Sequence, residues 1–171
     1  QKLEINSIGN FTDGYPITKW KNITSTGAAG SDPGKVFVDT DFPVFRLADA
    51  YLIYAESVLR GGGGGSAATA LTYVNLLRTR AYKGSTAANL NAGQLTLGFI
   101  LNERGREFMW EGQRRTDLIR FKKFTGADYI WPWKGGVKAG STTVPAYRDI
   151  FPIPYSDLVA NPNLKQNPGY N

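Results

Sequence analysis

The segment from Val44 to Arg60 carries two apolar stripes at helical spacing, and no other feature constrains the fold as strongly. Its stripes are Leu47, Tyr51, Tyr54 and Val58 on one side and Ala48, Leu52, Ala55 and Leu59 on the other. A helix that is apolar on two sides has to be covered on both, so we expect it to be mostly buried. Because Arg46, Asp49 and Glu56 interrupt the apolar run, the segment is not a membrane span.

A second helix is predicted directly after a run of five glycines. The run, Gly61–Gly65, lacks the Gly-Lys-Ser/Thr ending of a phosphate-binding loop and follows a helix, so we interpret it as a connector. Ser66 is a suitable cap for a helix over residues 67–81, whose predicted inward stripe is Ala70, Val74, Leu77 and Ala81. The two helices predict an antiparallel pair of the length of a tetratricopeptide-type repeat, which needs helical neighbours to bury both faces.

The remaining sequence predicts one more helical stretch between long loops. A third helix is expected from about Thr96, and Gly112 is expected to stop or kink it before a shorter helical piece over residues 113–124. Short strands are expected in YPITKW and KVFVDT, within a loop-rich beginning. The predicted fold is therefore mainly α, with tetratricopeptide-like helix pairs, long loops and a few short strands. Its parts are a lead-in at 1–42, a helical core at 43–124, and a loop with a C-terminal segment at 125–171.

Composition excludes several classes of function. The 171 residues include no cysteine and no histidine, which excludes disulfides, thiol catalysis, histidine-based triads and the usual zinc sites. The net charge is +6, but most arginines alternate with acidic residues and form no basic stripe, so we expect no nucleic-acid partner. The chain begins QKLEI, without an initiator methionine or a signal segment, and we expect it to be a piece of a longer protein.

Residues 100–121, ILNERGREFMWEGQRRTDLIRF, concentrate acidic and basic side chains among apolar ones. Glu103, Glu107 and Glu111 recur every four residues, so they are predicted to share a helix face, where two carboxyls could approach the ~5 Å separation of a retaining glycosidase. That chemistry requires a carboxyl with a raised pKa, whereas the neighbouring arginines favour the ionised form. We therefore predict structural ion pairs between helices, made by Glu103, Arg104, Glu107, Glu111, Arg114, Asp117 and Arg120.

Four motifs in a fixed order resemble a known family. FPVFRLADAYLIYAE, VNLLRTRA, ILNERGREFMWEGQRRTDLIRF and FPIPYSDLVANPNLKQNPGY are similar to the C-terminal part of SusD/RagB-type nutrient-binding outer-membrane lipoproteins of Bacteroidetes. The family pattern E-R-x-x-E-[F/L]-x-x-E-G-x-R-x-x-D-L-x-R is matched without a break from Glu103 to Arg120. The resemblance covers residues 41–170, and residues 1–40 match only loosely.

The resemblance implies a function as well as a SusD-like fold. It implies a protein that captures glycans without cleaving them and acts with a TonB-dependent, SusC-like transporter. It also implies attachment outside the outer membrane, where this chain would reach the membrane only through a lipid anchor that lies outside it. A helical-repeat module that grips a peptide is the alternative from another class.

Aromatic side chains in loops are the candidate ligand contacts. Flat aromatic faces suit the C–H groups of a sugar, and Tyr129, Trp131 and Trp133 lie close together in one loop. Trp20, next to Asn22, is a further candidate. The alternative for each tryptophan is a loop anchor packed against the core. No cofactor is expected apart from a structural calcium ion, which the resemblance implies near Asp128, with surface solvation of this carboxylate as the alternative.

Overall fold

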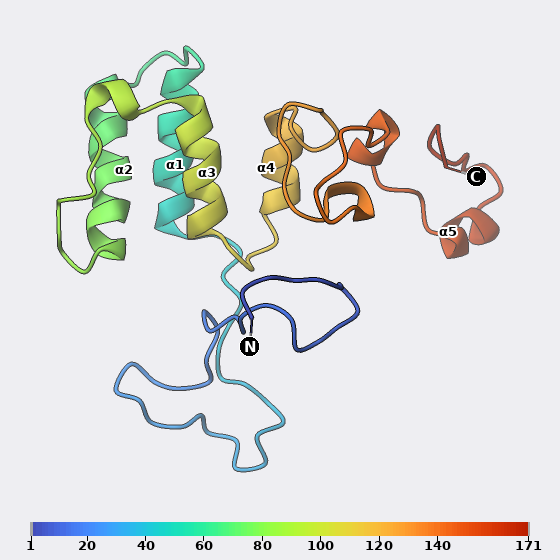
Figure 1. The fold of residues 1–171 in the computed structure, drawn as a ribbon, viewed down its shortest axis with the longest axis horizontal. Coiled ribbons are helices and arrows are strands. Elements are labelled where there is room, and N and C mark those ends of the chain that lie inside the picture. The colour runs from blue at the N-terminus through green and yellow to red at the C-terminus, as the bar shows by residue number, and fades with distance from the viewer. Residues whose placement is uncertain (1, 171) are drawn as a thin grey trace. The chain divides into compact units, whose positions relative to one another are not determined.

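Helices make up the regular structure of residues 2–170, which the computed structural model describes (Figure 1). The chain divides into two compact units, residues 1–114 and 115–171. The α-helices are α1 (Leu47–Leu59), α2 (Ala67–Ala81), α3 (Leu97–Glu107), α4 (Arg114–Arg120) and α5 (Tyr155–Ala160). The 3-10 helices are η1 (Ala92–Gln94), η2 (Lys134–Gly136) and η3 (Ala146–Asp149). The prediction of a mainly α-helical fold is confirmed.

Helices α1 and α2 form the predicted antiparallel pair, and α3 packs against α1 (Figure 1). Gly61 ends α1 with a φ of +86°, and the Ser66 side chain caps α2 by accepting a hydrogen bond from the Thr69 amide at 3.1 Å. The core of this unit is built from small and branched residues of the three helices, namely Ala48, Leu52, Ala55, Ala70, Val74, Leu77, Ile100 and Leu101. Of the predicted inward stripe of α2, only Ala81 is exposed.

The two apolar stripes of α1 differ in how far they are covered. The stripe with Ala48, Leu52 and Ala55 is buried. On the other stripe, Tyr51 and Tyr54 pack against Tyr73 of α2, with ring centres 4.4 Å and 5.1 Å apart. Leu47 and Ile53, at the start and middle of α1, are 64% and 50% exposed, so α2 and α3 cover this helix only in part.

Helix α3 begins where predicted but ends earlier. Thr96 caps it by accepting from the Phe99 amide at 3.1 Å. The helix stops at Glu107, and residues 108–113 form turns in which Trp110 and Gly112 have φ values of +62° and +76°. Gly112 therefore belongs to the connection between α3 and α4 and does not itself end the helix.

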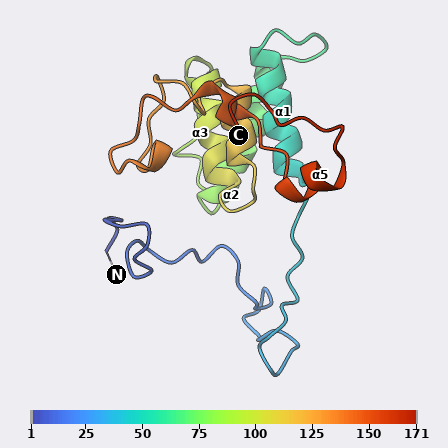
Figure 2. The ribbon, with the colours of Figure 1, turned by 90° about the vertical axis from the view of Figure 1, so that its right-hand side faces the viewer.

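The prediction of short strands in YPITKW and KVFVDT is wrong. Residues 2–46 contain only two isolated bridges, Lys2 with Asp13 and Ile23 with Ala29, and no strand. Figures 1 and 2 draw this segment as coil outside the helices of its unit. Its turns are held instead by side chains, as where the Asp32 carboxylate accepts from the amides of Val36 and Phe37 at 2.8 Å and 2.9 Å. Among the described residues, no helix is both long and apolar enough to cross a membrane.

The unit of residues 115–171 consists mainly of loops pinned by side-chain hydrogen bonds. Its C-terminal segment folds back on the residues before α5, because the Gln166 amide both donates to the Ile153 carbonyl and accepts from the Ile153 amide, at 2.9 Å and 2.8 Å. The Tyr170 hydroxyl donates to the Ile150 carbonyl at 2.7 Å, and its ring packs edge-on against Tyr147.

Candidate functional site

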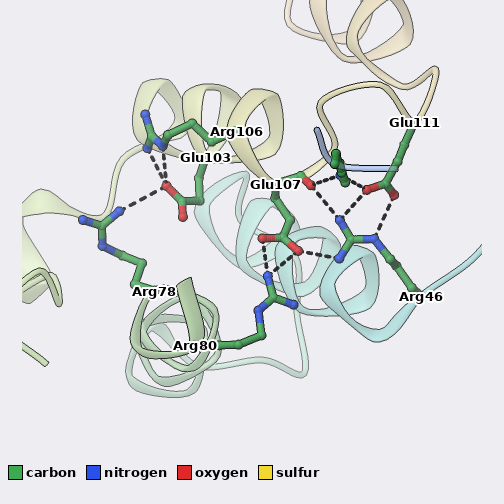
Figure 3. Close-up of polar contacts among 8 residues, drawn as sticks. Arg46, Arg78, Arg80, Glu103, Arg106, Glu107 and Glu111 are labelled. Carbon is green, nitrogen blue, oxygen red and sulfur yellow. Dashed lines mark hydrogen bonds and ion pairs between the residues drawn. The ribbon is translucent and has the colours of Figure 1, made fainter. Parts of the chain in front are cut away.

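The carboxylate of Glu103 is bound by two arginines, one from α2 and one from its own helix α3 (Figure 3). Arg78 of α2 donates to it at 3.2 Å, and Arg106, one turn further along α3, donates through two nitrogens. Glu103 is buried, so these contacts replace the water that an ionised carboxylate would otherwise bind.

Arg46, directly before α1, joins Glu107 and Glu111 (Figure 3). Its Nε and Nη2 donate to the two carboxylate oxygens of Glu111, each at 2.8 Å, and its Nη1 donates to Glu107. Arg80 binds both oxygens of Glu107, at 2.6 Å and 2.5 Å, and Lys19 pairs with Glu111. Two acidic residues thus share three cations drawn from three different parts of the chain.

This arrangement keeps both carboxyls ionised. Burial by itself would raise the pKa of Glu107, but hydrogen bonds from Arg80 and Arg46 outweigh it and leave that pKa below its ordinary value. Glu111 behaves alike: burial raises its pKa, and the bonds from Arg46 and Lys19 lower it further than burial raises it. Burial would lower the pKa of Arg46, and the bonds to Glu111 and Glu107 raise it above its ordinary value.

The predicted shared face of the three glutamates is thus only partly formed. Glu103 and Glu107 lie on consecutive turns of α3, but Glu111 lies beyond the end of that helix. Arg46 binds the carboxylates of both Glu107 and Glu111, and Lys19 binds the Glu107 carbonyl and the Glu111 carboxylate. None of the three carboxylates is free of a cation, which is the arrangement of a scaffold that fixes α1, α2 and α3 together.

The remaining charged residues of the motif also have partners. Arg104 is buried and binds Asp49 of α1 and the Gln113 side chain, both at 2.7 Å, and Arg120 pairs with Asp117 at 2.8 Å. Arg114 donates to the Leu101 carbonyl at 2.8 Å, with its guanidinium against Gly105. This bond to a backbone carbonyl adds to the predicted ion pairing of Arg114, which stays a prediction.

Arg46, Glu107 and Glu111 also line a pocket of about 580 Å³. Four basic side chains line it, those of Lys19, Arg46, Arg80 and Arg106, together with Glu107 and Glu111. Trp20 forms part of its wall, and Trp20 also lines a second pocket of about 370 Å³.

The second pocket is mainly aromatic. Its rings are Trp20, Phe42 and Trp110, and its polar side chains include Asn22, Thr40 and Asp41. Trp20 packs on Phe42 with ring centres 5.9 Å apart, and its indole N–H donates to the Trp110 carbonyl at 3.3 Å. Phe42 and Trp110 are 60% and 64% exposed, so their rings are open to a ligand.

Sequence reasoning identified Trp20 in this pocket but missed Trp110. Trp110 belongs to the charged stretch, where a helix would have placed it on an ordinary helical face. Its left-handed backbone conformation, φ +62°, turns it out of the helical path instead. The glycine two residues later was the available signal, because it marks the turn that exposes this ring.

The other predicted aromatic candidates lie in the unit of residues 115–171. Trp131 has Tyr129 and Phe124 as neighbours, with ring centres 6.2 Å and 6.3 Å away, and the Lys134 ammonium lies 4.7 Å from its ring centre. Trp133 has a left-handed backbone with a φ of +67°. Tyr129, Trp131 and Trp133 are all half-buried, which is the environment of loop anchors as much as of ligand contacts.

Asp128, the predicted calcium ligand, is exposed and paired with Lys123. The hydrogen bond from Lys123 lowers the pKa of Asp128 below its ordinary value. Within residues 2–170, acidic side chains do not gather in threes as potential metal ligands. The surroundings of Asp128 therefore do not fit a calcium site, since its one carboxylate already has a cation.

Fold and pockets together define a helical, tetratricopeptide-like protein with an aromatic pocket at the end of its charged helix. The chain belongs to the SusD family, whose model matches residues 4–170. It is 42% identical over 170 residues to the starch-binding protein SusD of Bacteroides thetaiotaomicron, covering 99% of this chain and 28% of that protein. It is 34% identical over 131 residues to the SusD-like protein P25 of Formosa agariphila, covering 75% of this chain and 24% of that protein.

Solved structures agree with this assignment. A SusD superfamily protein from Bacteroides vulgatus aligns with a TM-score of 0.56 and 27% identity, over 83% of this chain and 31% of that one. NanU of B. fragilis aligns with a TM-score of 0.50 and 34% identity, over 77% of this chain and 27% of that one. The chain thus spans less than a third of the length of each of these relatives.

Proposed function

We propose that this chain is part of a glycan-binding component of an outer-membrane uptake system, which captures oligosaccharide and delivers it to a TonB-dependent, SusC-like transporter. Membership of the SusD family supports this proposal, as does the name of the Bacteroides thetaiotaomicron relative, which describes a starch-binding protein. The proposed location is the extracellular face of the outer membrane, through a lipid anchor outside these residues.

The aromatic pocket of Trp20, Phe42 and Trp110 carries the proposal for this chain. A pyranose ring offers C–H groups on its faces and hydroxyls at its edge, so a protein binds it with flat rings and nearby hydrogen-bonding groups. This pocket has three rings, and Asn22, Thr40 and Asp41 lie at its border. Its size, about 370 Å³, is in the range of small-ligand pockets.

The aromatic loop is the weaker of the two candidates. Trp131 already packs against Phe124, and its ring is in contact with the Lys134 ammonium. Tyr129, Trp131 and Trp133 as sugar contacts nevertheless remain a prediction, to be compared directly with the aromatic pocket.

A binding role without catalysis is part of the same proposal. A glycosidase needs one carboxyl that stays protonated near neutral pH. Glu107 and Glu111 have lowered pKa values, and Glu103 is bound by two arginines. These three acidic residues are therefore suited to hold helices together.

Calorimetry with starch-derived maltooligosaccharides and a panel of other oligosaccharides tests the proposal. Using the oligosaccharide that binds most tightly, Trp110→Ala and Trp20→Ala should each weaken binding by about tenfold or more, since a central aromatic contact contributes about 2 kcal/mol. The matched control is Trp131→Ala combined with Trp133→Ala, which should retain affinity. Loss of binding in the control alone would assign the sugar contacts to the aromatic loop, and a lack of binding to every glycan would contradict the function.

A further inference from the structure

The ammonium of Lys134 is enclosed by the backbone of the loop that precedes it. Lys134 is 1% exposed, the largest of the fully buried side chains in the described part of the chain. Its Nζ donates to the Tyr129 carbonyl at 2.8 Å, to the Gly126 carbonyl, and more weakly to the Lys123 carbonyl at 3.4 Å. An ammonium can donate three hydrogen bonds, and three carbonyl oxygens lie within reach of this one, the Lys123 carbonyl at the longest distance.

The printed contacts of the Lys134 ammonium are with backbone carbonyls, and its charge acts on the nearby Asp128 carboxylate only at longer range, where it helps to lower the pKa of Asp128. Asp128, the acidic residue of the loop, pairs with Lys123 instead. A buried charge is costly unless its surroundings replace the lost hydration. Here neutral carbonyl oxygens do so, and the Trp131 ring, 4.7 Å from Nζ to the ring centre, adds a cation–π contact.

The backbone on both sides of Lys134 is shaped to direct this side chain inward. Trp133 and Gly135 flank it in left-handed conformations, with φ values of +67° and +65°. For tryptophan this conformation costs about 1–2 kcal/mol, so other contacts have to stabilise it. The Ser141 amide closes the turn by donating to the Lys134 carbonyl at 2.9 Å.

We propose that residues 123–129 form a cation site made of backbone carbonyls, in which the bound cation is the protein's own Lys134 ammonium. Converging carbonyl oxygens are also ligands that calcium accepts. In this loop they are already bound to Lys134, and the neighbouring carboxylate is bound to Lys123. Calcium is therefore excluded from the loop, and the charge that orders residues 123–141 is covalently attached.

Removing the Lys134 side chain should convert the loop into a site for a free monovalent cation. Lys134→Ala removes the ammonium and leaves space for an ion, whereas Lys134→Met removes the charge but keeps a side chain of similar length in that space. Amide hydrogen exchange of residues 123–141, measured by mass spectrometry, reports the order of the loop itself. Ammonium chloride is the probe, and lithium chloride at the same concentration is the control for salt screening.

The expected result is faster exchange of this segment in both variants and recovery by ammonium, but not lithium, in Lys134→Ala alone. The unchanged protein should show no response of this segment to either salt or to calcium chloride. Unchanged exchange in Lys134→Ala would overturn the proposal, as would equal recovery with both salts or in both variants. Slower exchange of residues 123–141 in the unchanged protein on adding calcium would also overturn it, and this measurement does not depend on the variants being folded. Glycan binding is not involved, so failure here leaves the proposed function untouched.

Discussion

The guanidinium of Arg46 binds the carboxylate of Glu111 in a two-point contact, Nε to Oε2 and Nη2 to Oε1, each 2.8 Å long, across 65 residues of sequence. Glu107 receives the remaining terminal nitrogen of the same arginine. The planar fork of arginine makes this geometry possible, because a lysine ammonium has no second parallel donor. The contact ties the residue before α1 to the turn after α3.

Replacing Arg46 by alanine should lower the free energy of unfolding by about 2–4 kcal/mol, because it removes one of the cations shared by two largely buried carboxylates. Arg46→Lys should be intermediate. Urea denaturation followed by circular dichroism measures the effect. As a control, Lys165→Ala, on the surface, should change stability by less than about 0.5 kcal/mol. A wild-type midpoint for Arg46→Ala would show that the network adds nothing to stability.

The effect of Gly105→Ala on stability should change sign when Arg114 is also replaced. A Cβ at Gly105 would lie 2.9 Å from Nη1 of Arg114, so Gly105→Ala should push the guanidinium off the Leu101 carbonyl and cost about 1–2 kcal/mol. In an Arg114→Ala background the same substitution should stabilise α3 by about 0.5–1 kcal/mol, since alanine is the better helix former. Thermal or chemical unfolding of the four proteins tests this, and additive effects would disprove the contact.

Acid should lower the free energy of unfolding by protonating Glu107 and Glu111. Their pKa values are below the ordinary 4.5 in the folded state, so the stability that they contribute is fully present above about pH 4.5. This contribution is lost as pH falls through the lower, folded-state values. The free energy of unfolding measured from pH 6 downward should therefore fall less steeply in Glu107→Gln than in the unchanged protein. Identical pH dependence would mean that Glu107 is not bound to arginine in solution.

The protein should release no reducing ends from polysaccharides. Glu103, Glu107 and Glu111 are each bound to arginine or lysine side chains, an arrangement that does not suit a general acid. A reducing-sugar assay with starch and other glycans tests this expectation. Turnover that Glu103→Gln or Glu107→Gln abolishes would replace binding with catalysis as the function.

The sequence by itself determined the elements whose signals are local. Helical periodicity placed α1, α2 and α3, and Ser66 and Thr96 mark starts that depend only on the next turn. The alternation of acidic and basic residues likewise predicted ion pairs, because unpaired buried charges are too costly. Local signals were less reliable in YPITKW and KVFVDT, where apolar residues fit a strand but the structure provides no partner strand.

Only the tertiary structure decided which groups meet. Arg46 and Glu111 are too distant in sequence for helical spacing to relate them. Arg114 binds the Leu101 carbonyl, and a pattern of side chains cannot predict a bond to a backbone carbonyl. Trp110 and Lys134 depend on left-handed residues, Trp110 itself and Trp133, which single-sequence propensities do not identify. The aromatic pocket and the carbonyl-bound ammonium come from loop conformations and long-range contacts, whose energy is realised only when the whole unit is folded.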